Sequence, residues 1–393
     1  SSPLTVVPTN VYSGMAKFLL LAIPFFVLSG NIMAKAGISS RLVAFADDCV
    51  GHRRGGIAIV AVIVACFFGA ISGSGPATVA ALGIILIPAM INRGGFSAPF
   101  ASSLMASASS IAIVIPPSIA FVVYASITGV SVGDMFMGGW IPGIMMGLSQ
   151  VIIIMIECRK KGIQASKAKS SWGQRWKSFR EAFWGFLMPV IIIGGIYGGV
   201  FTPTEAAAVS VVYGLVVGVF IYREVKMKDM IDILVDSGKT TGGIMLIIGA
   251  ATLFSYVCTV FGIAQAAQAL LLEISGNKYI FLLLVNILLL IVGCFMDPTP
   301  AVLIFTPIFL PIVQTWGMHP VHFGLMMVMN LCVGTLTPPV GAILFAGCRT
   351  HGVKIEQIIK MLLPFFAVIF VTLLLITYVP ALSMFIPEAL GLV

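Results

Sequence analysis

The carboxylate of Asp297 is the side chain in this sequence whose position most needs a chemical explanation. It interrupts a long apolar run between Tyr279 and Val313, and no other carboxylate stands so far inside such a run. If the run lies in a membrane, a charge there costs roughly 3 kcal/mol or more, so carboxylates at such positions usually pair or bind something. Two compatible readings stay open: Asp297 caps a helix that begins at Pro298, or it binds or gates a cation.

Hydroxyl side chains stand at a similar interruption in an earlier run. The apolar run from Gly56 to Ile91 is broken at Ser72–Pro76, with Thr78 close behind, and Thr299 follows the interruption of the second run. A half-helix starting at each interruption presents free amide hydrogens and a positive dipole end, which favour anions. Lys and Arg, Lys239 included, are expected only in loops outside the membrane. An anionic substrate would therefore be held by amide dipoles, hydroxyls or a partner.

A second kind of break follows each interruption. Each combines a Pro-Pro pair with preceding small residues: Ser107, Ser109, Ser110, Pro116 and Pro117 in one case, Gly334, Thr335, Thr337, Pro338 and Pro339 in the other. Unwound carbonyls and hydroxyls are hard oxygen ligands suited to a monovalent cation such as sodium. The structural alternative is that Ser and Thr bond back to helix carbonyls and Gly allows close packing. That alternative is favoured for any single residue, whereas the recurrence favours a cation site for the clusters.

These features recur because the sequence contains an internal repeat. Matching positions lie 222 or 223 residues apart, as in Ile87-Pro88 with Leu310-Pro311 and Pro116-Pro117 with Pro338-Pro339. Several matches in the same order at a near-constant offset indicate a duplicated unit. Paired interrupted hydrophobic segments in the two halves of a membrane protein point to a transport site where the repeats meet.

Composition places the chain in a membrane. Of its 393 residues 59% are hydrophobic and 9% charged, whereas globular proteins carry about a quarter charged residues. The net charge of +8 comes from basic loops between apolar runs. It therefore indicates how the chain is oriented in the membrane and does not indicate nucleic-acid binding. The seven cysteines stand singly, without metal-ligand spacing, and read as small apolar residues.

The basic residues set the topology. A tracing with two re-entrant hairpins puts Lys and Arg on one side, apart from Lys17 and Lys278, and the positive-inside rule makes that side cytoplasmic. The hairpin at 56–91 then enters from the cytoplasm and the hairpin at 279–313 from the opposite side. Residues 263–274 read as a helix along the membrane surface. The predicted fold is an all-α polytopic membrane protein with inverted repeats, two re-entrant hairpins and interrupted helices.

The same tracing divides the chain into three parts. Residues 1–158 form the first repeat, which contains a scaffold helix, the first hairpin and an interrupted helix at 98–127. Residues 159–182 form a basic cytoplasmic linker. Residues 183–393 form the second repeat, with scaffold helices, the second hairpin and an interrupted helix at 324–346.

The histidines weigh against an enzyme. All four lie in or next to loops, at His52, His319, His322 and His351. This placement excludes a Ser-His protease built around Gly73-Ser74-Gly75 and a two-His metal site. A polar catalytic set at membrane depth is therefore not expected.

At these motifs the sequence resembles the large membrane subunit of tripartite ATP-independent periplasmic (TRAP) transporters. The matching segments are LLAIPFFVLSGNIM (20–33), FFGAISGSGPAT (67–78), IPPSIAFVVYA (115–125), GGIYGGVFTPTEAAAV (194–209), FMDPTPAVLIFTPIFLPI (295–312) and VGTLTPPVGAILF (333–345). They cover nearly the whole chain and are specific in combination. The family usually carries one more hydrophobic segment before the position of Tyr12, so the sequence is expected to begin late.

The resemblance implies a secondary transporter of a bacterial inner membrane, driven by a sodium gradient. Its substrate would be an organic acid of the C4-dicarboxylate or sialic acid class. The implied partners are a small four-helix membrane subunit and a periplasmic solute-binding protein that delivers the acid. An elevator motion is also implied, in which the part containing the hairpins slides against a scaffold.

Carried over position by position, the interruptions and breaks would form the sites. The implied substrate-binding residues are Ser72, Ser74, Thr78, Pro117, Thr299 and Thr337. The implied sodium ligands are Ser72, Gly73, Ser107, Ser109, Ser110, Asp297, Thr299, Gly334, Thr335 and Thr337.

Two other functions stay open beside this one. A stand-alone sodium-coupled carrier of dicarboxylates or other anions would share the same architecture but need no binding protein. A membrane enzyme or a channel would belong to a different class, and the lack of a polar catalytic set weighs against the enzyme.

Overall fold

The structure is a computed structural model that describes residues 4–165, 167–263, 265, 266, 269, 273 and 277–392. These residues fold into helices and connections, without a β-strand. Nine of the described helices are long and apolar enough to cross a membrane. The all-helical membrane fold expected from the sequence is therefore confirmed, whereas the expected surface helix at 263–274 lies largely outside the described residues.

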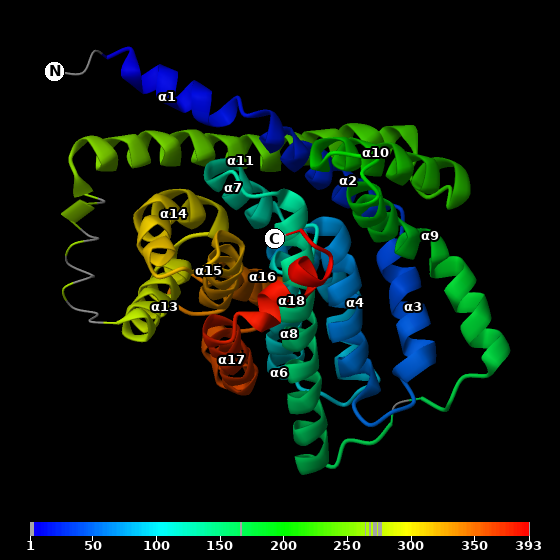
Figure 1. The fold of residues 1–393 in the computed structure, drawn as a ribbon. Coiled ribbons are helices and arrows are strands. Elements are labelled where there is room, and N and C mark those ends of the chain that lie inside the picture. Colours follow the sequence, from blue (N-terminus) through cyan, green and yellow to red (C-terminus); the bar gives the residue numbers. More distant parts are fainter. Residues whose placement is uncertain are drawn as a thin grey trace.

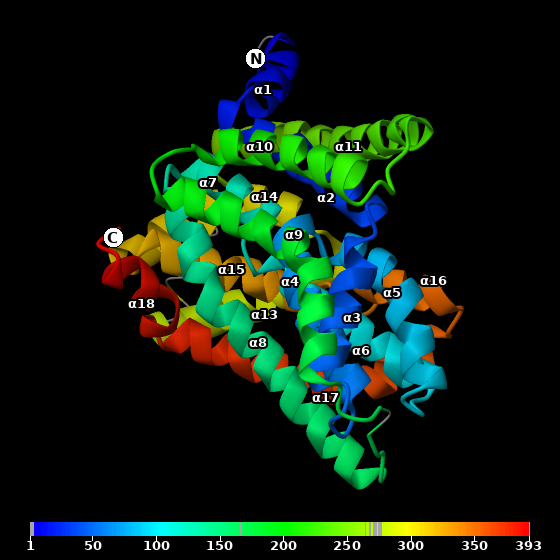
Figure 2. The ribbon, with the colours of Figure 1, turned by 90° about the vertical axis from the view of Figure 1, so that its right-hand side faces the viewer.

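Four helices form a layer along one side of the molecule, at the top of Figures 1 and 2, which we call the scaffold layer. They are α1 (Val6–Met15), α2 (Ala22–Lys35, preceded by the 3-10 turn η1, Phe18–Leu21), α10 (Pro203–Leu215, extended by the π-helical η3, Val216–Ile221) and α11 (Met227–Val260). The 34 residues of α11 rise about 51 Å. Because a bilayer core is about 30 Å thick, a spanning α11 has to tilt or extend beyond it.

The first interrupted run is a helical hairpin of α4 (Gly56–Ser72) and α5 (Gly75–Asn92). A side chain added to Gly94, just after α5, would lie 2.7 Å from Ile57 at the start of α4. The chain therefore leaves the hairpin where it entered, as predicted for a re-entrant hairpin.

The second interrupted run repeats this arrangement in α13 (Lys278–Phe295) and α14 (Pro298–Thr315). The rings of Phe281, near the start of α13, and Trp316, just after α14, lie with their centroids 4.9 Å apart. The second run is therefore also a hairpin whose two ends lie together.

An interrupted helix follows each hairpin, and further helices complete the bundle. The first consists of α6 (Ala98–Ser110), the 3-10 turn η2 (Ile111–Ile113) and α7 (Ile119–Thr128), and the second of α15 (Pro320–Gly334) and α16 (Ala342–His351). Both Pro-Pro pairs between the pieces contain a cis peptide bond. The remaining helices are α3 (Ile38–Val50), α8 (Val132–Lys160), α9 (Trp172–Tyr197), α17 (Ile355–Tyr378) and α18 (Ala381–Ala389).

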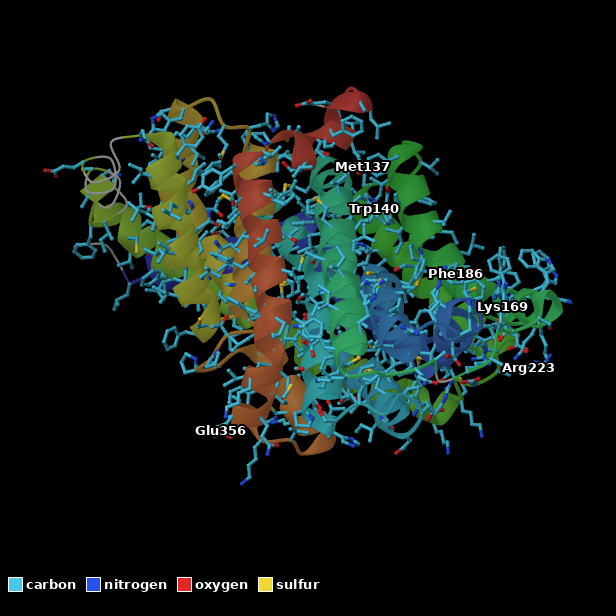
Figure 3. The ribbon with its side chains drawn as sticks, turned by 90° about the horizontal axis from the view of Figure 1, so that it is seen from below. Met137, Trp140, Lys169, Phe186, Arg223 and Glu356 are labelled. Carbon is cyan, nitrogen blue, oxygen red and sulfur yellow. The ribbon has the colours of Figure 1, made fainter. Side chains whose placement is uncertain are left out.

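The two hairpins enter from opposite ends of the molecule, and α17 shows this because it reaches both ends. In its first half Phe365 packs on Phe100, at the beginning of α6 beside the base of the first hairpin, with centroids 5.6 Å apart. At its end the Tyr378 hydroxyl donates to the carbonyl of Tyr279, at the base of the second hairpin, over 3.3 Å. Figure 3 shows Glu356, in the first turn of α17, at the end of the molecule away from α18. The inverted arrangement is thus confirmed.

Equivalent positions of the two repeats meet at the centre. The Cys332 thiol donates to the carbonyl of Ser110 at 3.0 Å, and these residues are 222 apart in sequence, the offset of the repeat. Contact between equivalent residues requires the axis that relates the two halves to pass between them. Figure 1 shows the second-half helix α15 beside the first-half helix α8.

The basic linker is shorter than the expected 159–182, because α8 runs to Lys160 and α9 starts at Trp172. Asp48 holds it, accepting hydrogen bonds from Lys167 at 2.6 Å and from the Ser170 hydroxyl at 2.8 Å. Burial alone would raise the pKa of Asp48, but the hydrogen bonds from Lys167, Ser170 and Ser178 outweigh it and hold that pKa below its usual value.

Candidate functional site

The tip of the first hairpin, residues 72–76, turns sharply because of a glycine. Gly73 has a φ of 61° and ends α4, and Ser74 is extended and precedes α5. A Cβ on Gly73 would lie 2.9 Å from the carbonyl oxygen of Pro117. The tip therefore packs against the first Pro-Pro break so closely that only glycine fits, and Pro117 acts there through its backbone.

Two of the predicted substrate-binding hydroxyls, those of Ser72 and Thr78, bond to each other. The Ser72 and Thr78 hydroxyls lie 2.9 Å apart, and Thr78 Oγ1 also donates to the carbonyl of Ser74 at 2.8 Å. Both side chains are buried. This pair stabilises the tip from behind, which leaves the Ser74 side chain at its outer surface.

The second tip, residues 297–300, carries the only charge at either tip. Asp297 is the N-cap of α14, and its Oδ1 accepts a hydrogen bond from the Thr299 amide at 3.3 Å. The side chain of Asp297 is exposed. The capping reading is therefore confirmed, and a further role in binding a cation stays a prediction.

Matched close contacts join each hairpin to its own break. A Cβ on Gly69 of α4 would lie 2.7 Å from the Cα of Ala112, and one on Gly293 of α13 would lie 2.9 Å from the Cα of Gly334. Because backbones approach this closely only where side chains are absent or small, Gly334 has a packing function. In the second half the amide of Gly341 also donates to the carbonyl of Cys294 at 3.1 Å.

The hydroxyls of the first break are buried and two of them lack partners. Ser107, Ser109 and Ser110 are fully buried, and only Ser110 Oγ is satisfied, donating to the carbonyl of Ser107 at 2.7 Å. Within the described residues, Ser107 Oγ and Ser109 Oγ have no hydrogen-bond partner. The Ser109 carbonyl also lies 3.3 Å from the Cβ position of Gly75, at the first tip. Buried hydroxyls without partners fit the predicted sodium ligands, because an unpaired buried polar group is costly unless something binds it.

The threonines of the second break differ. Thr335 Oγ1 donates to the carbonyl of Cys332 at 2.6 Å, and Thr337 Oγ1 to that of Val333 at 3.2 Å. This is the back-bonding that the structural alternative describes. Thr337 also borders a small apolar cavity with Leu336, away from the tips, so the structure does not bring it together with the tip residues.

A cavity of about 400 Å³ lies where the two tips meet the scaffold layer. The first tip contributes Ser74 to its lining, the second tip contributes Asp297 and Thr299, and α11 contributes Lys239 and Thr240. Ligand sites commonly occupy cavities of about 300–1,000 Å³ with a few placed polar groups. Of the predicted substrate residues, Ser74 and Thr299 line this cavity, whereas Ser72, Thr78, Pro117 and Thr337 do not.

Lys239 is the residue of this site that sequence reasoning missed. The sequence predicts it in a cytoplasmic loop, but it lies inside α11, and that expectation is wrong. The helical spacing of Lys239, Gly243 and Ile247 on the cavity wall could have revealed it. A Cβ on Gly243 would have nothing within 4 Å, so α11 leaves open space in front of the tips.

A larger cavity, of about 730 Å³, lies between α4, α8 and α9 and is lined by apolar residues and glycines. Its walls include Trp140 of α8 and Phe186 of α9, which Figure 3 labels. Its lining includes no charged side chain that could recognise a charged ligand. The smaller cavity between the tips is therefore the candidate binding site.

Comparison with known proteins identifies the family. The profile described as "Tripartite ATP-independent periplasmic transporter, DctM component" matches residues 1–382. The chain is 44% identical over 384 residues to the C4-dicarboxylate TRAP transporter large permease protein DctM of Pseudomonas aeruginosa, which covers 98% of this chain and 89% of the relative.

Two other relatives carry different substrate names. The isethionate TRAP transporter permease protein DctMQ of Oleidesulfovibrio alaskensis is 40% identical over 385 residues, covering 98% of this chain and 60% of the relative. The sialic acid TRAP transporter large permease protein SiaM of Vibrio cholerae is 35% identical over 379 residues, covering 96% of this chain and 88% of the relative.

A solved structure shares the fold. The Alcanivorax borkumensis YdaH transporter matches with a TM-score of 0.67 at 12% sequence identity, covering 95% of this chain and 87% of that chain. The likeness extends to the fold alone, whereas the sequence relatives establish the family. The chain is a multi-pass protein of a bacterial inner membrane and belongs to the DctM component family of tripartite ATP-independent periplasmic transporters.

Proposed function

We propose that this chain is the transport subunit of a sodium-driven TRAP system that imports an organic acid. The observation that carries the proposal is the cavity at which two hairpin tips, entering from opposite ends of the molecule, meet the scaffold layer and contribute a few polar groups. A site at the junction of inverted repeats is accessible from either side after a modest movement, which alternating access requires.

The substrate class is supported by the relatives and by the cavity. The relatives' names specify a C4-dicarboxylate, isethionate and sialic acid, all of which are anions at neutral pH. The helices α5 and α14 begin at the cavity with Ser74 and Asp297 as N-caps. The positive dipole ends of these two helices, with the hydroxyls of Ser74 and Thr299, suit an acidic group. Amide hydrogens for an anion come from the start of α5, because Pro298 and Pro300 have none and the Thr299 amide is bonded to Asp297.

The buried hydroxyls support coupling to sodium. Ser107 and Ser109 would supply oxygen ligands, together with carbonyls of the first break, and Asp297 would supply a negative charge at the second tip. A bound sodium ion contributes positive charge, which offsets the charge of an incoming acid. Binding of the two ions is then mutually favourable, and that is the basis of symport.

An elevator motion is the proposed transport step. The hairpins and their breaks contact one another, whereas the cavity wall opposite them belongs to α11 of the scaffold layer. That wall carries Gly243 with open space before it, which leaves room for the tips to move along α11 at this point. The proposed partners are a small membrane subunit that steadies the scaffold and a periplasmic binding protein that delivers the acid, and the substrate leaves unchanged.

The test is uptake into proteoliposomes that contain this chain and its small subunit. With an inward sodium gradient and the cognate binding protein outside, radiolabelled succinate, isethionate or N-acetylneuraminic acid should accumulate, and choline in place of sodium should abolish accumulation. Failure of all three acids to accumulate under the gradient would contradict the proposal. Full uptake without the binding protein would favour a stand-alone carrier instead.

A further inference from the structure

Lys239 is a cation on the scaffold wall of the transport cavity. It is the thirteenth residue of the 34 in α11, and its side chain is exposed. Asp297 and Thr299 of the second tip and Ser74 of the first line the same cavity. Lys239 therefore faces both hairpin tips from a helix that belongs to neither hairpin.

Structural ion pairing does not account for this lysine. Two other basic residues on this side of the molecule form ion pairs: Lys35 lies 3.4 Å from Asp229, and Arg41 lies 2.5 Å from Glu224. Among the described residues, no carboxylate lies within 4.0 Å of the Lys239 ammonium. The charge is thus free to interact with a group that enters the cavity.

A lysine near the end of a membrane helix can also extend its ammonium along the helix to the aqueous surface. The position of its neighbours argues against that alternative. Thr240, Gly243 and Ile247 lie on the same helical face and line the same cavity, so this face of α11 is directed at the tips. The open space before Gly243 provides room for a ligand beside the lysine.

The tips alone leave the electrostatics of an anion site incomplete. They offer neutral hydroxyls and helix dipoles, but Asp297 adds a negative charge that repels an acidic substrate. A cation on the opposite wall offsets this repulsion, and ammonium–carboxylate hydrogen bonds are among the strong ones. Building on the proposed function, we propose that the Lys239 ammonium binds an acid group of the transported substrate, a carboxylate or sulfonate, from the scaffold side of the cavity.

This assignment has a consequence for the mechanism. Because Lys239 belongs to the scaffold layer, it meets the substrate only while the tips face this part of α11. The contact then favours binding in one position of the hairpins and is lost when they move away. Neutralising Lys239 should therefore weaken acid binding without weakening the binding of sodium by the first break.

The experiment compares Lys239→Met with Lys239→Arg and with Lys228→Met as a matched control. Lys228 lies on the same helix and is exposed, but it does not line the cavity. The purified membrane complex is titrated with succinate and with its diamide, succinamide. The sodium concentration at which sodium binding is half-maximal is measured in parallel. Titration of the membrane complex needs neither the binding protein nor a gradient.

Lys239→Met should weaken succinate binding about tenfold or more, the order expected for loss of one charge-assisted hydrogen bond. Binding of succinamide and the half-saturating sodium concentration should stay within about twofold, since neither involves this charge. Lys239→Arg should recover most of the affinity, and Lys228→Met should match the parent. If Lys239→Met does not assemble, Lys239→Gln provides the same charge removal.

Succinate affinity at the parent value in an assembled neutral variant would overturn the proposal. An equal loss of succinamide affinity would also overturn it, because that loss would show that the substitution changed the shape of the cavity and not only its charge. If the parent binds succinate but shows no sodium-driven uptake, the proposed function fails while the Lys239 assignment is still decided by the titration.

Discussion

The two repeats place similar tips and breaks at one centre but equip them differently. The first repeat has a neutral tip, locked from behind by Ser72 and Thr78, and a break with two buried hydroxyls that lack partners among the described residues. The second repeat has a charged tip at Asp297 and a break whose threonines bond to their own helix. The two repeats thus share one arrangement of helices. The buried hydroxyls without partners lie in the first repeat, whereas the charged residue lies in the second.

The largest expected effect concerns the close packing of the first tip. Gly73→Ala should separate the tip from Pro117 and abolish uptake, because a Cβ there would lie 2.9 Å from a backbone oxygen. Gly95→Ala is the control, since Gly95 has a φ of 67° but nothing within 4 Å of its Cβ position. Both variants carry left-handed strain of about 1–2 kcal/mol, and only Gly73→Ala adds a clash.

Thermal melting and sodium-driven uptake of the purified variants measure the difference. Equal behaviour of the two alanine variants would show that the contact of the first tip with its break is not required.

The next effect separates the two roles of Asp297. Asn caps a helix about as well as Asp, so Asp297→Asn should leave the melting temperature unchanged while removing the charge. Uptake should fall about tenfold or more, which corresponds to about 1.4 kcal/mol. Asp297→Ala should in addition lose about 1 kcal/mol of stability. Parent-level uptake by the Asn variant would mean that Asp297 is a cap and nothing more.

The matching change at the first tip should cost no stability. Ser74 is also an N-cap, but its side chain makes no capping hydrogen bond. Ser74→Ala should therefore melt at the parent temperature and lower uptake by removing a hydroxyl from the cavity, by about fivefold if it donates one hydrogen bond to substrate. A stability loss as large as that of Asp297→Ala would contradict this difference between the tips.

The two breaks should differ in their response to sodium. Ser109→Ala removes a buried hydroxyl without a partner, so the protein should stay equally stable while the half-saturating sodium concentration rises about fivefold to tenfold. Thr335→Val removes a satisfied hydrogen bond, so stability should fall by about 1 kcal/mol with sodium dependence unchanged. The reverse pattern would move the predicted sodium ligands to the second break.

The smallest effect concerns the bases of the hairpins. Ion pairs surround the first base: Arg93, next to α5, lies 2.7 Å from Asp47, and Asp48 holds the linker. Because the pKa of Asp48 is below its usual value in the folded protein, its contribution to stability is present above about pH 4 and is lost as the pH falls further. At the second base, the rings of Phe281 and Trp316 make the contact, and no ion pair joins the described residues there.

Lowering the pH from about 6 to about 3.5 should thus reduce the free energy of unfolding slightly more in the parent than in Asp48→Asn, by less than about 1 kcal/mol, and the melting temperature should fall accordingly. An Asp48→Asn variant as acid-sensitive as the parent would assign the sensitivity to other groups.

The sequence predicted the hairpins and breaks because glycine, proline and hydroxyl residues interrupt apolar runs, and membranes tolerate such interruptions only inside protein. It predicted the opposite orientations of the two hairpins because basic loops mark the cytoplasmic side of the membrane. Lys239 was misplaced because the apolar segment starting at Gly242 is long enough to span, so the polar residues before it read as a loop. Only the folded structure shows that α11 continues to Met227 and presents the lysine to the tips.

The orientation of hydroxyls also escaped prediction. Ser72 and Thr78 were expected to bind substrate, and nothing in their spacing reveals that they would bond to each other. Whether a serine bonds back to its helix, as Ser110 does, or stays unpaired, as Ser109 does, depends on neighbours brought in by other helices.

The central claim is that both tips bind one substrate in one cavity, and cysteine protection tests it most directly. Ser74→Cys and Thr299→Cys are introduced separately, with Gly95→Cys at the hairpin base as control, and labelled with a hydrophilic thiol reagent. Succinate with sodium should slow labelling at both tips together and leave position 95 unchanged. Protection at one tip alone, or at neither tip under conditions of saturating uptake, would contradict a shared site.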